Sequence, residues 1–250
     1  MVIPSVFGFR AIASGLFCLL AGAAIAAPPV PILVYHRFDP SQSGLTTVTT
    51  ACFTQQLDWL AAHHYQIIPL AQLAQWRDIP SPAVAITVDD GHESVFTQLY
   101  PILRQRHIHV TLFIYPSAIS HAPYALTWPQ LDEMVKSGLV DVQSHTYWHP
   151  DFRKEKAARS PADYRAFVGM QLTKSKTVLE QRLGVSVTML AWPYGIHDPT
   201  LEEEARRAGY IAAFAYAGGQ ARPGDDPFSI PRIPVSGGVT LAQFARLVSP

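Results

Sequence analysis

Two adjacent carboxylates end an apolar run in the segment AITVDDGHES, residues 85–94. Residues 85–88 have the composition of a buried strand, and Asp89 and Asp90 follow it directly. Two neighbouring carboxylates repel each other, and each is costly to remove from water without a positive partner. A divalent cation would be such a partner. The alternative is structural: Asp89 could cap the helix expected to follow.

A second motif, SHTYWHP at 144–150, places His145 and His149 so that one helical turn or a tight loop brings both imidazoles to one point. Two imidazoles and one carboxylate are a common ligand set of catalytic divalent metals, and they leave positions open for water and substrate. We therefore predict that Asp90, His145 and His149 bind a metal and that Asp89 accepts a proton from water as general base. The ligands suit Zn²⁺, and also Co²⁺, Ni²⁺ or Fe²⁺.

The elements that must position these residues follow a regular alternation. Segments with helical patterns separate most of seven apolar segments of strand length, at 31–36, 65–70, 83–88, 110–115, 139–144, 187–192 and 210–216. This alternation predicts one α/β domain with a parallel sheet. Because no glycine-rich phosphate loop follows the first strand, a closed or nearly closed barrel is favoured over an open sheet. His36, both aspartates, both histidines and Pro193-Tyr194 then fall at carboxyl ends of strands, where such barrels form active sites.

The first 26 residues predict a secretory signal peptide. Arg10 precedes an apolar stretch that ends in the cleavage pattern Ala24-Ile25-Ala26. The alternative is an uncleaved membrane anchor, because the stretch is only slightly shorter than a spanning helix. With cleavage, residues 27–250 form a secreted or periplasmic domain without stable membrane insertion, which we expect to be a monomer.

Composition excludes several other classes of protein. Of the two cysteines, Cys18 would leave with the signal peptide, so Cys52 has no partner for an internal disulfide. The formal net charge is zero and no run of Lys or Arg occurs, which argues against nucleic acid or an anionic membrane surface as partner.

The motifs TVDDG, HTYWH and WPYG resemble, in this order, the first three motifs of the polysaccharide deacetylases of the NodB-homology type, carbohydrate esterase family 4. The resemblance extends over about residues 30–236; Val88 replaces the usual Phe of the first motif, and the second motif is matched in full. It implies a distorted (β/α)7 barrel, a zinc-type metal on Asp90, His145 and His149, and Asp89 as base. The implied reaction is hydrolysis of N-acetyl or O-acetyl groups on an acetylated polysaccharide.

The resemblance also implies how the substrate is held. The third motif places Trp192, Pro193 and Tyr194 along one wall of a sugar groove, with the Tyr194 N–H as donor to the oxyanion. Tyr147 and Trp148, which lie within the second motif, either add stacking surface for the sugar or serve in packing.

Two features of the family are missing. Ala191 stands where the third motif usually has an Arg, and the late Leu-x-His that supplies the general acid is absent. The sequence resembles the branch that deacetylates poly-β-1,6-N-acetylglucosamine, in which a His of an early Tyr-His motif acts as acid. This implies His36 as acid, with His197 as the rival, and Arg232 as the substrate-site cation that steadies Asp89.

We therefore predict a metal-dependent enzyme that removes N-acetyl groups from a β-linked N-acetylglucosamine polysaccharide. One alternative is an O-acetyl esterase acting on xylan or a related glycan. Another is a catalytically silent glycan-binding relative, which the two missing residues favour and the intact aspartates and histidines oppose.

Overall fold

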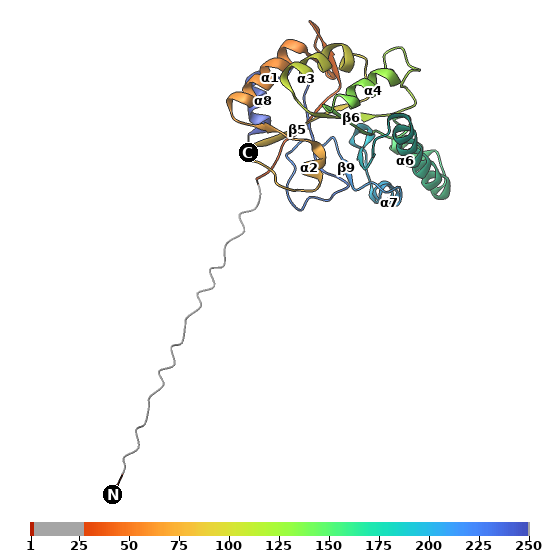
Figure 1. The fold of residues 1–250 in the computed structure, drawn as a ribbon. Helices are drawn as coiled ribbons and strands as arrows, with labels where there is room; N and C mark the ends of the chain where they lie inside the picture. Colours follow the sequence, from red (N-terminus) through yellow and green to blue (C-terminus); the bar gives the residue numbers. More distant parts are fainter. Residues whose placement is uncertain (3–27, 250) are drawn as a thin grey trace.

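A curled parallel sheet forms the centre of the protein in the computed structural model, which describes residues 1–2 and 28–249 (Figure 1). Seven strands follow one another in the order β10 (Ile233–Pro234), β1 (Ile32–Tyr35), β5 (Ala83–Asp89), β6 (Val110–Ile114), β7 (Val140–Ser144), β8 (Met189–Ala191) and β9 (Ala212–Phe214). At the open side, the Ala215 N–H donates to the carbonyl of Ile230 at 2.9 Å, shortly before β10. The sheet is thus a curled half-barrel whose two edge strands are linked through this contact. The predicted single-domain, distorted (β/α) barrel is confirmed. The predicted signal peptide lies outside the described residues, apart from its first two.

Helices surround this sheet (Figure 1). The longer ones are α1 (Thr50–Ala62), α3 (Tyr100–Arg106), α4 (Trp128–Lys136), α6 (Pro161–Leu183), α7 (Pro199–Arg207) and α8 (Leu241–Val248). Shorter ones are α2 (Leu70–Ala74), α5 (Phe152–Ala157), the π-helical turn η1 (Val95–Leu99) and the 3₁₀ turn η2 (Pro193–Gly195). Thr127 and Asp198 cap α4 and α7, accepting the N–H groups of Gln130 and Leu201. Within the described ranges, none of these helices combines the length and apolarity needed to cross a bilayer.

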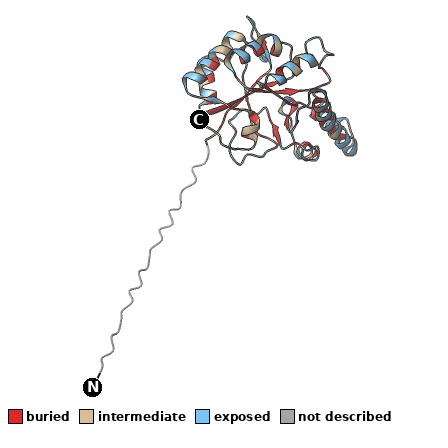
Figure 2. Cartoon of the chain, in the orientation of Figure 1, coloured by how far each residue is buried: buried red, intermediate tan, exposed pale blue. Residues whose placement is uncertain are grey.

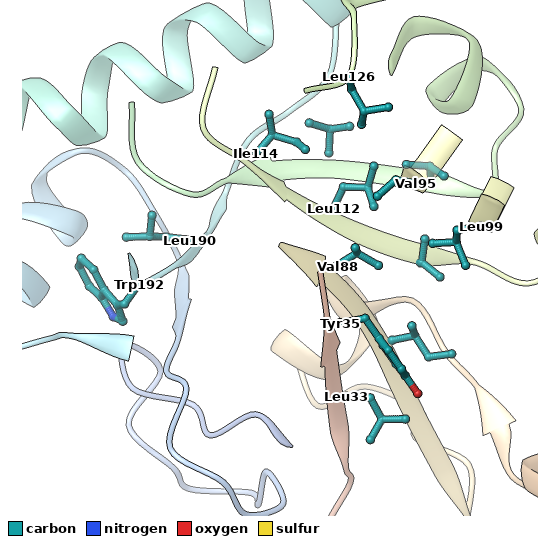
Figure 3. Packing of buried hydrophobic residues seen from close by; sticks show 14 of the residues in the cluster. Leu33, Tyr35, Val88, Val95, Leu99, Leu112, Ile114, Leu126, Leu190 and Trp192 are labelled. Carbon is teal, nitrogen blue, oxygen red and sulfur yellow. The ribbon is translucent and has the colours of Figure 1, made fainter. Parts of the chain in front are cut away.

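Both faces of the strands are buried, which explains their continuous apolar runs. Alternate residues such as Leu33, Val88 and Leu112 pack in the large core beneath the helices (Figure 3). The residues between them, such as Ala85 and Phe113, pack on the opposite face with α2. Figure 2 shows the buried residues concentrated on the strands and on the helix faces that meet them.

One predicted strand has a different place from the one expected. Residues 65–70 supply only β4 (Gln66–Ile67), which pairs with the start of β5 beside the main strand path. Its place in the seven-strand path is taken by β10, a two-residue strand whose second residue is Pro234. A second, two-stranded sheet of β2 (Arg37–Asp39) and β3 (Thr47–Thr49) follows β1 and was not predicted.

Candidate active site

The two aspartates diverge at the end of β5. Side chains alternate along the strand, so Asp89 continues the row of Ala85 and Thr87 into the interior, where it is only 2% exposed. Asp90 and Gly91 then adopt left-handed backbone conformations, with φ of 75° and 76°. A Cβ on Gly91 would lie 2.8 Å from the Cδ1 atom of Ile114, so any larger residue in this turn would force the Ile114 side chain to shift. This turn carries the Asp90 carboxylate over the end of the sheet.

The two histidines lie on a tight loop after β7. Thr146 and His149 both have positive φ, at 65° and 61°, which is costly for a β-branched residue such as Thr146. Side-chain hydrogen bonds hold the loop: the Thr146 hydroxyl accepts the His149 N–H at 3.2 Å, and the Ser144 hydroxyl accepts the Thr146 N–H at 3.2 Å. The strained conformation directs both imidazoles to the same side.

Asp90, His145 and His149 converge on one point. The Asp90 Oδ1 lies 3.6 Å from His145 Nε2 and 3.7 Å from His149 Nε2, and the three ligand atoms all lie within 4.8 Å of one another. The His145 Nδ1 lies 2.8 Å from the Ala191 carbonyl, which can only accept, so Nδ1 carries the proton and the Nε2 lone pair faces Asp90. The arrangement fits a divalent cation.

The protonation of these groups agrees with that fit. Burial lowers the pKa of His145 to about 3 and also lowers the pKa of His149, so both imidazoles are neutral, as metal ligands must be. Burial, and to a smaller extent the charge of Asp89, raise the pKa of Asp90. A cation at this point would remove that penalty.

Asp89 has a partner of its own. Its two carboxylate oxygens accept hydrogen bonds from Nη1 and Nη2 of Arg232, at 2.8 and 2.7 Å. Arg232 is fully buried, and it also donates to the Thr87 hydroxyl at 3.0 Å and to the Ala215 carbonyl at 3.2 Å. Burial alone would raise the pKa of Asp89, but Arg232, and then His145, hold it at about 2. Asp89 is therefore an ion-paired carboxylate rather than a helix cap, and Arg232 lies beneath the site rather than on its surface.

A pocket of about 250 Å³ opens above these groups. Its lining consists of His36, Thr46, Asp89, Asp90, His145, His149, Trp192, Tyr194, Gly195 and Tyr216. His36, at the end of β1, faces the Tyr216 ring at 5.9 Å between ring centroids. His197 is outside this lining and its Nδ1 lies 3.0 Å from Glu202 at the start of α7. Of the predicted groove wall, only Tyr194 is exposed at the pocket. Trp192 borders the pocket but is 1% exposed and packs in the core, and Pro193 is buried.

The family follows from a match over most of this scaffold. The polysaccharide deacetylase family model matches residues 77–213, more than half of the 250 residues, and includes the Asp89-Asp90 turn, the histidine loop and η2. The chain belongs to the polysaccharide deacetylase family.

Relatives of this deacetylase-family chain include two curated proteins named poly-beta-1,6-N-acetyl-D-glucosamine N-deacetylase. The one from Staphylococcus epidermidis is 27% identical over 197 residues, which cover 76% of this chain and 68% of the relative. The one from Escherichia coli is 24% identical over 247 residues, covering 81% of this chain but only 35% of the relative. This chain therefore spans about a third of the length of the second relative.

Solved structures confirm the fold of this family member. The Streptococcus pyogenes deacetylase PplD superimposes with a TM-score of 0.79 at 22% identity, covering 89% of this chain and 99% of that one. IcaB from Ammonifex degensii superimposes with a TM-score of 0.76 at 26% identity, covering 90% and 99% of the two chains.

Two lining residues were missed by the sequence analysis. Tyr216 ends the predicted strand 210–216, and the position of the other candidates at strand ends could have pointed to it. Thr46 lies in a segment without apolar periodicity, just before β3, and no sequence signal indicated it.

Proposed function

We propose that this polysaccharide deacetylase is a metal-dependent hydrolase that removes N-acetyl groups from a β-linked N-acetylglucosamine polymer. The observation that carries the proposal is the convergence of Asp90, His145 and His149 beside an ion-paired Asp89 at the floor of one pocket. The names of the two curated relatives support the N-acetylglucosamine polymer as substrate.

Asp90, His145 and His149 would hold the cation, most simply Zn²⁺, with Co²⁺, Ni²⁺ or Fe²⁺ as other candidates. A cation bound there would polarise the acetyl carbonyl and acidify a water molecule. Asp89 is ionised at neutral pH and fixed by Arg232, so it is ready to accept a proton. A carboxylate with a pKa of about 2 is a weak base. Asp89 can therefore act as general base only when the water molecule that gives up the proton has become strongly acidic.

The remaining steps fall to residues on the pocket wall. The amide nitrogen must gain a proton before the amine leaves, and His36 lines the pocket as the donor for it. The Tyr194 N–H, in a turn with a φ of 56°, would donate to the developing oxyanion. The exposed Tyr194 would bound the sugar on one side, and the buried Trp192 would support this wall from the core.

The location of the enzyme is part of the proposal. The charge and cleavage pattern of residues 1–26 support export, which places residues 27–250 in the periplasm or outside the cell as a monomeric domain.

Acetate release by the purified protein, loaded with zinc, tests the proposal. We expect release from β-1,6-linked N-acetylglucosamine oligomers, and we expect Asp89→Asn to retain zinc while losing about 10²–10⁴-fold in turnover. Release from acetylated xylan alone would show an O-acetyl esterase instead. A protein that binds no divalent ion and releases no acetate from either substrate would be a silent relative, and a fully active Asp89→Asn would remove Asp89 as base.

A further inference from the structure

Four aromatic side chains are exposed in the described part of the chain, and each follows a different strand. Tyr124 follows β6, Trp148 follows β7, Tyr194 follows β8 and Tyr216 follows β9, with exposed fractions of 41, 42, 64 and 38%. These four strands are consecutive neighbours in the parallel sheet, so their carboxyl ends share one edge. We call the four side chains the aromatic rim. Single exposed apolar residues need no explanation, but a set confined to one edge does.

The loops on one half of the rim are in direct contact. A Cβ on Gly195 would lie 2.7 Å from the backbone nitrogen of Tyr216, so the loops after β8 and β9 touch. The ring of Tyr194 lies 4.6 Å from that of His149 between centroids, which joins the loop after β8 to the loop after β7. The metal-ligand loop is therefore the centre of the rim.

The other half is joined in the same way. The Ser117 N–H donates to the Tyr147 carbonyl at 3.1 Å, linking the loops after β6 and β7. The Tyr115 ring lies 5.4 Å from the His149 ring, and its hydroxyl lies 3.0 Å from that of Tyr124. Tyr124 is therefore connected to the predicted ligand His149 through the side chain of Tyr115. Trp148 directly precedes His149 in the chain and packs edge-on against Phe167.

We propose that the aromatic rim is an extended sugar-binding track, on which Tyr124 and Trp148 bind sugar units of the polymer that lie beyond the reacting sugar and its direct neighbour. This inference rests on the proposed function. Tyr194 and Tyr216 line the pocket, whereas Tyr124 and Trp148 do not. The pocket of about 250 Å³ is smaller than a typical ligand site of about 300–1,000 Å³, so the rest of a polymer must lie outside it.

The chemistry of the rim matches an uncharged, acetylated sugar chain. A pyranose ring with equatorial substituents presents a face of C–H groups, and an aromatic ring offers a flat, electron-rich face for it. Tyrosine and tryptophan also supply large contact area at low conformational cost. Rings on successive loops give a polymer repeated contacts that a single sugar cannot use.

Chain-length dependence of acetate release tests this track. We expect Tyr124→Ala and Trp148→Ala each to lower kcat/KM for a β-linked N-acetylglucosamine pentamer by about three- to tenfold, while kcat/KM for the dimer changes by less than about twofold. Tyr124→Phe and Trp148→Phe keep an aromatic ring and should retain most of the pentamer activity. Ile211→Ala is the matched control, because Ile211 is an exposed apolar residue at the opposite, amino end of β9. Melting temperatures of all variants verify folding.

Each other outcome overturns the inference. Pentamer rates unchanged in both alanine variants, or equal losses on dimer and pentamer, would show that neither ring binds a sugar beyond the reacting one and its direct neighbour. A wild-type enzyme that hydrolyses dimer and pentamer equally well would overturn the track and leave the proposed function intact. A wild-type protein that releases no acetate from either oligomer would overturn the proposed function, and the track with it.

Discussion

Asp89 and Arg232 form an ion pair in the interior of the barrel, where both side chains are withdrawn from water. The bidentate geometry and the extra bonds from Arg232 to Thr87 and Ala215 satisfy four of the five N–H donors of the guanidinium. Removing one partner of such a pair destabilises the fold by about 3–5 kcal/mol, because the other charge is left buried without a partner. Its arrangement keeps the carboxylate ionised and fixed in orientation under the pocket.

The pair makes stability depend on pH in a defined window. The pKa of Asp89 is about 2 in the folded protein, against an ordinary value of 3.8, so the unfolded chain binds this proton more tightly. The pair therefore contributes roughly 2–3 kcal/mol above about pH 4, and this contribution is lost as the pH falls towards 2. We expect the difference in unfolding free energy between wild type and Asp89→Asn, measured with urea and a chelator present, to narrow across this window. A difference that stays constant from pH 7 to pH 2 would contradict the assignment.

The general acid can be assigned by comparing two histidines. His36 lines the pocket, whereas His197 is engaged with Glu202 at the start of α7. We expect His36→Ala to lower turnover by about 10²–10⁴-fold while zinc content stays at the wild-type level. His197→Ala serves as the matched control and should leave turnover unchanged. The reverse result would transfer the role to His197.

At the scale of elements, the sequence predicted most of the fold because burial on both faces leaves a continuous apolar run in each strand. It did not predict β10, since two residues that include Pro234 form no such run, and their place depends on pairing with β1 far away in the chain. The consequence is functional: the register Leu33–Ile233 brings the preceding residue, Arg232, against Asp89.

The candidate site also contains residues that the sequence predicts and residues whose role depends on the folded structure. The convergence of Asp90, His145 and His149 could be predicted because residue type and position at strand ends are both readable from the sequence. The burial of Arg232, and the contacts of Tyr216 and Thr46 with the pocket, depend on side-chain directions that only the folded chain fixes. Loop-to-loop contacts, such as that between Tyr194 and His149, leave no periodic signal either.

At the scale of the whole molecule, the proposed metal site forms only when the chain folds. Asp90 follows β5 and the two histidines follow β7, with β6 between these strands in the sheet, so the ligands converge only when the half-barrel is assembled. A cation that binds the folded but not the unfolded chain must stabilise the fold, by about 2.7 kcal/mol at a free concentration of 100 times Kd.

This coupling predicts how metal removal acts on the entire domain. A stabilisation of that size corresponds to roughly 5–10 °C in a domain of this length, so we expect a chelator to lower the Tm of wild type by that amount and added zinc to restore it. His149→Ala removes one of three ligands, so it should bind little zinc, release no acetate and melt at the same temperature with or without chelator. Ile211→Ala, which lies at the other end of the barrel, should respond to the chelator as wild type does. If chelation left the wild-type Tm unchanged, or lowered that of His149→Ala equally, the three side chains would not share an ion in the folded protein, because a shared ion must add its binding free energy to the fold that creates its site.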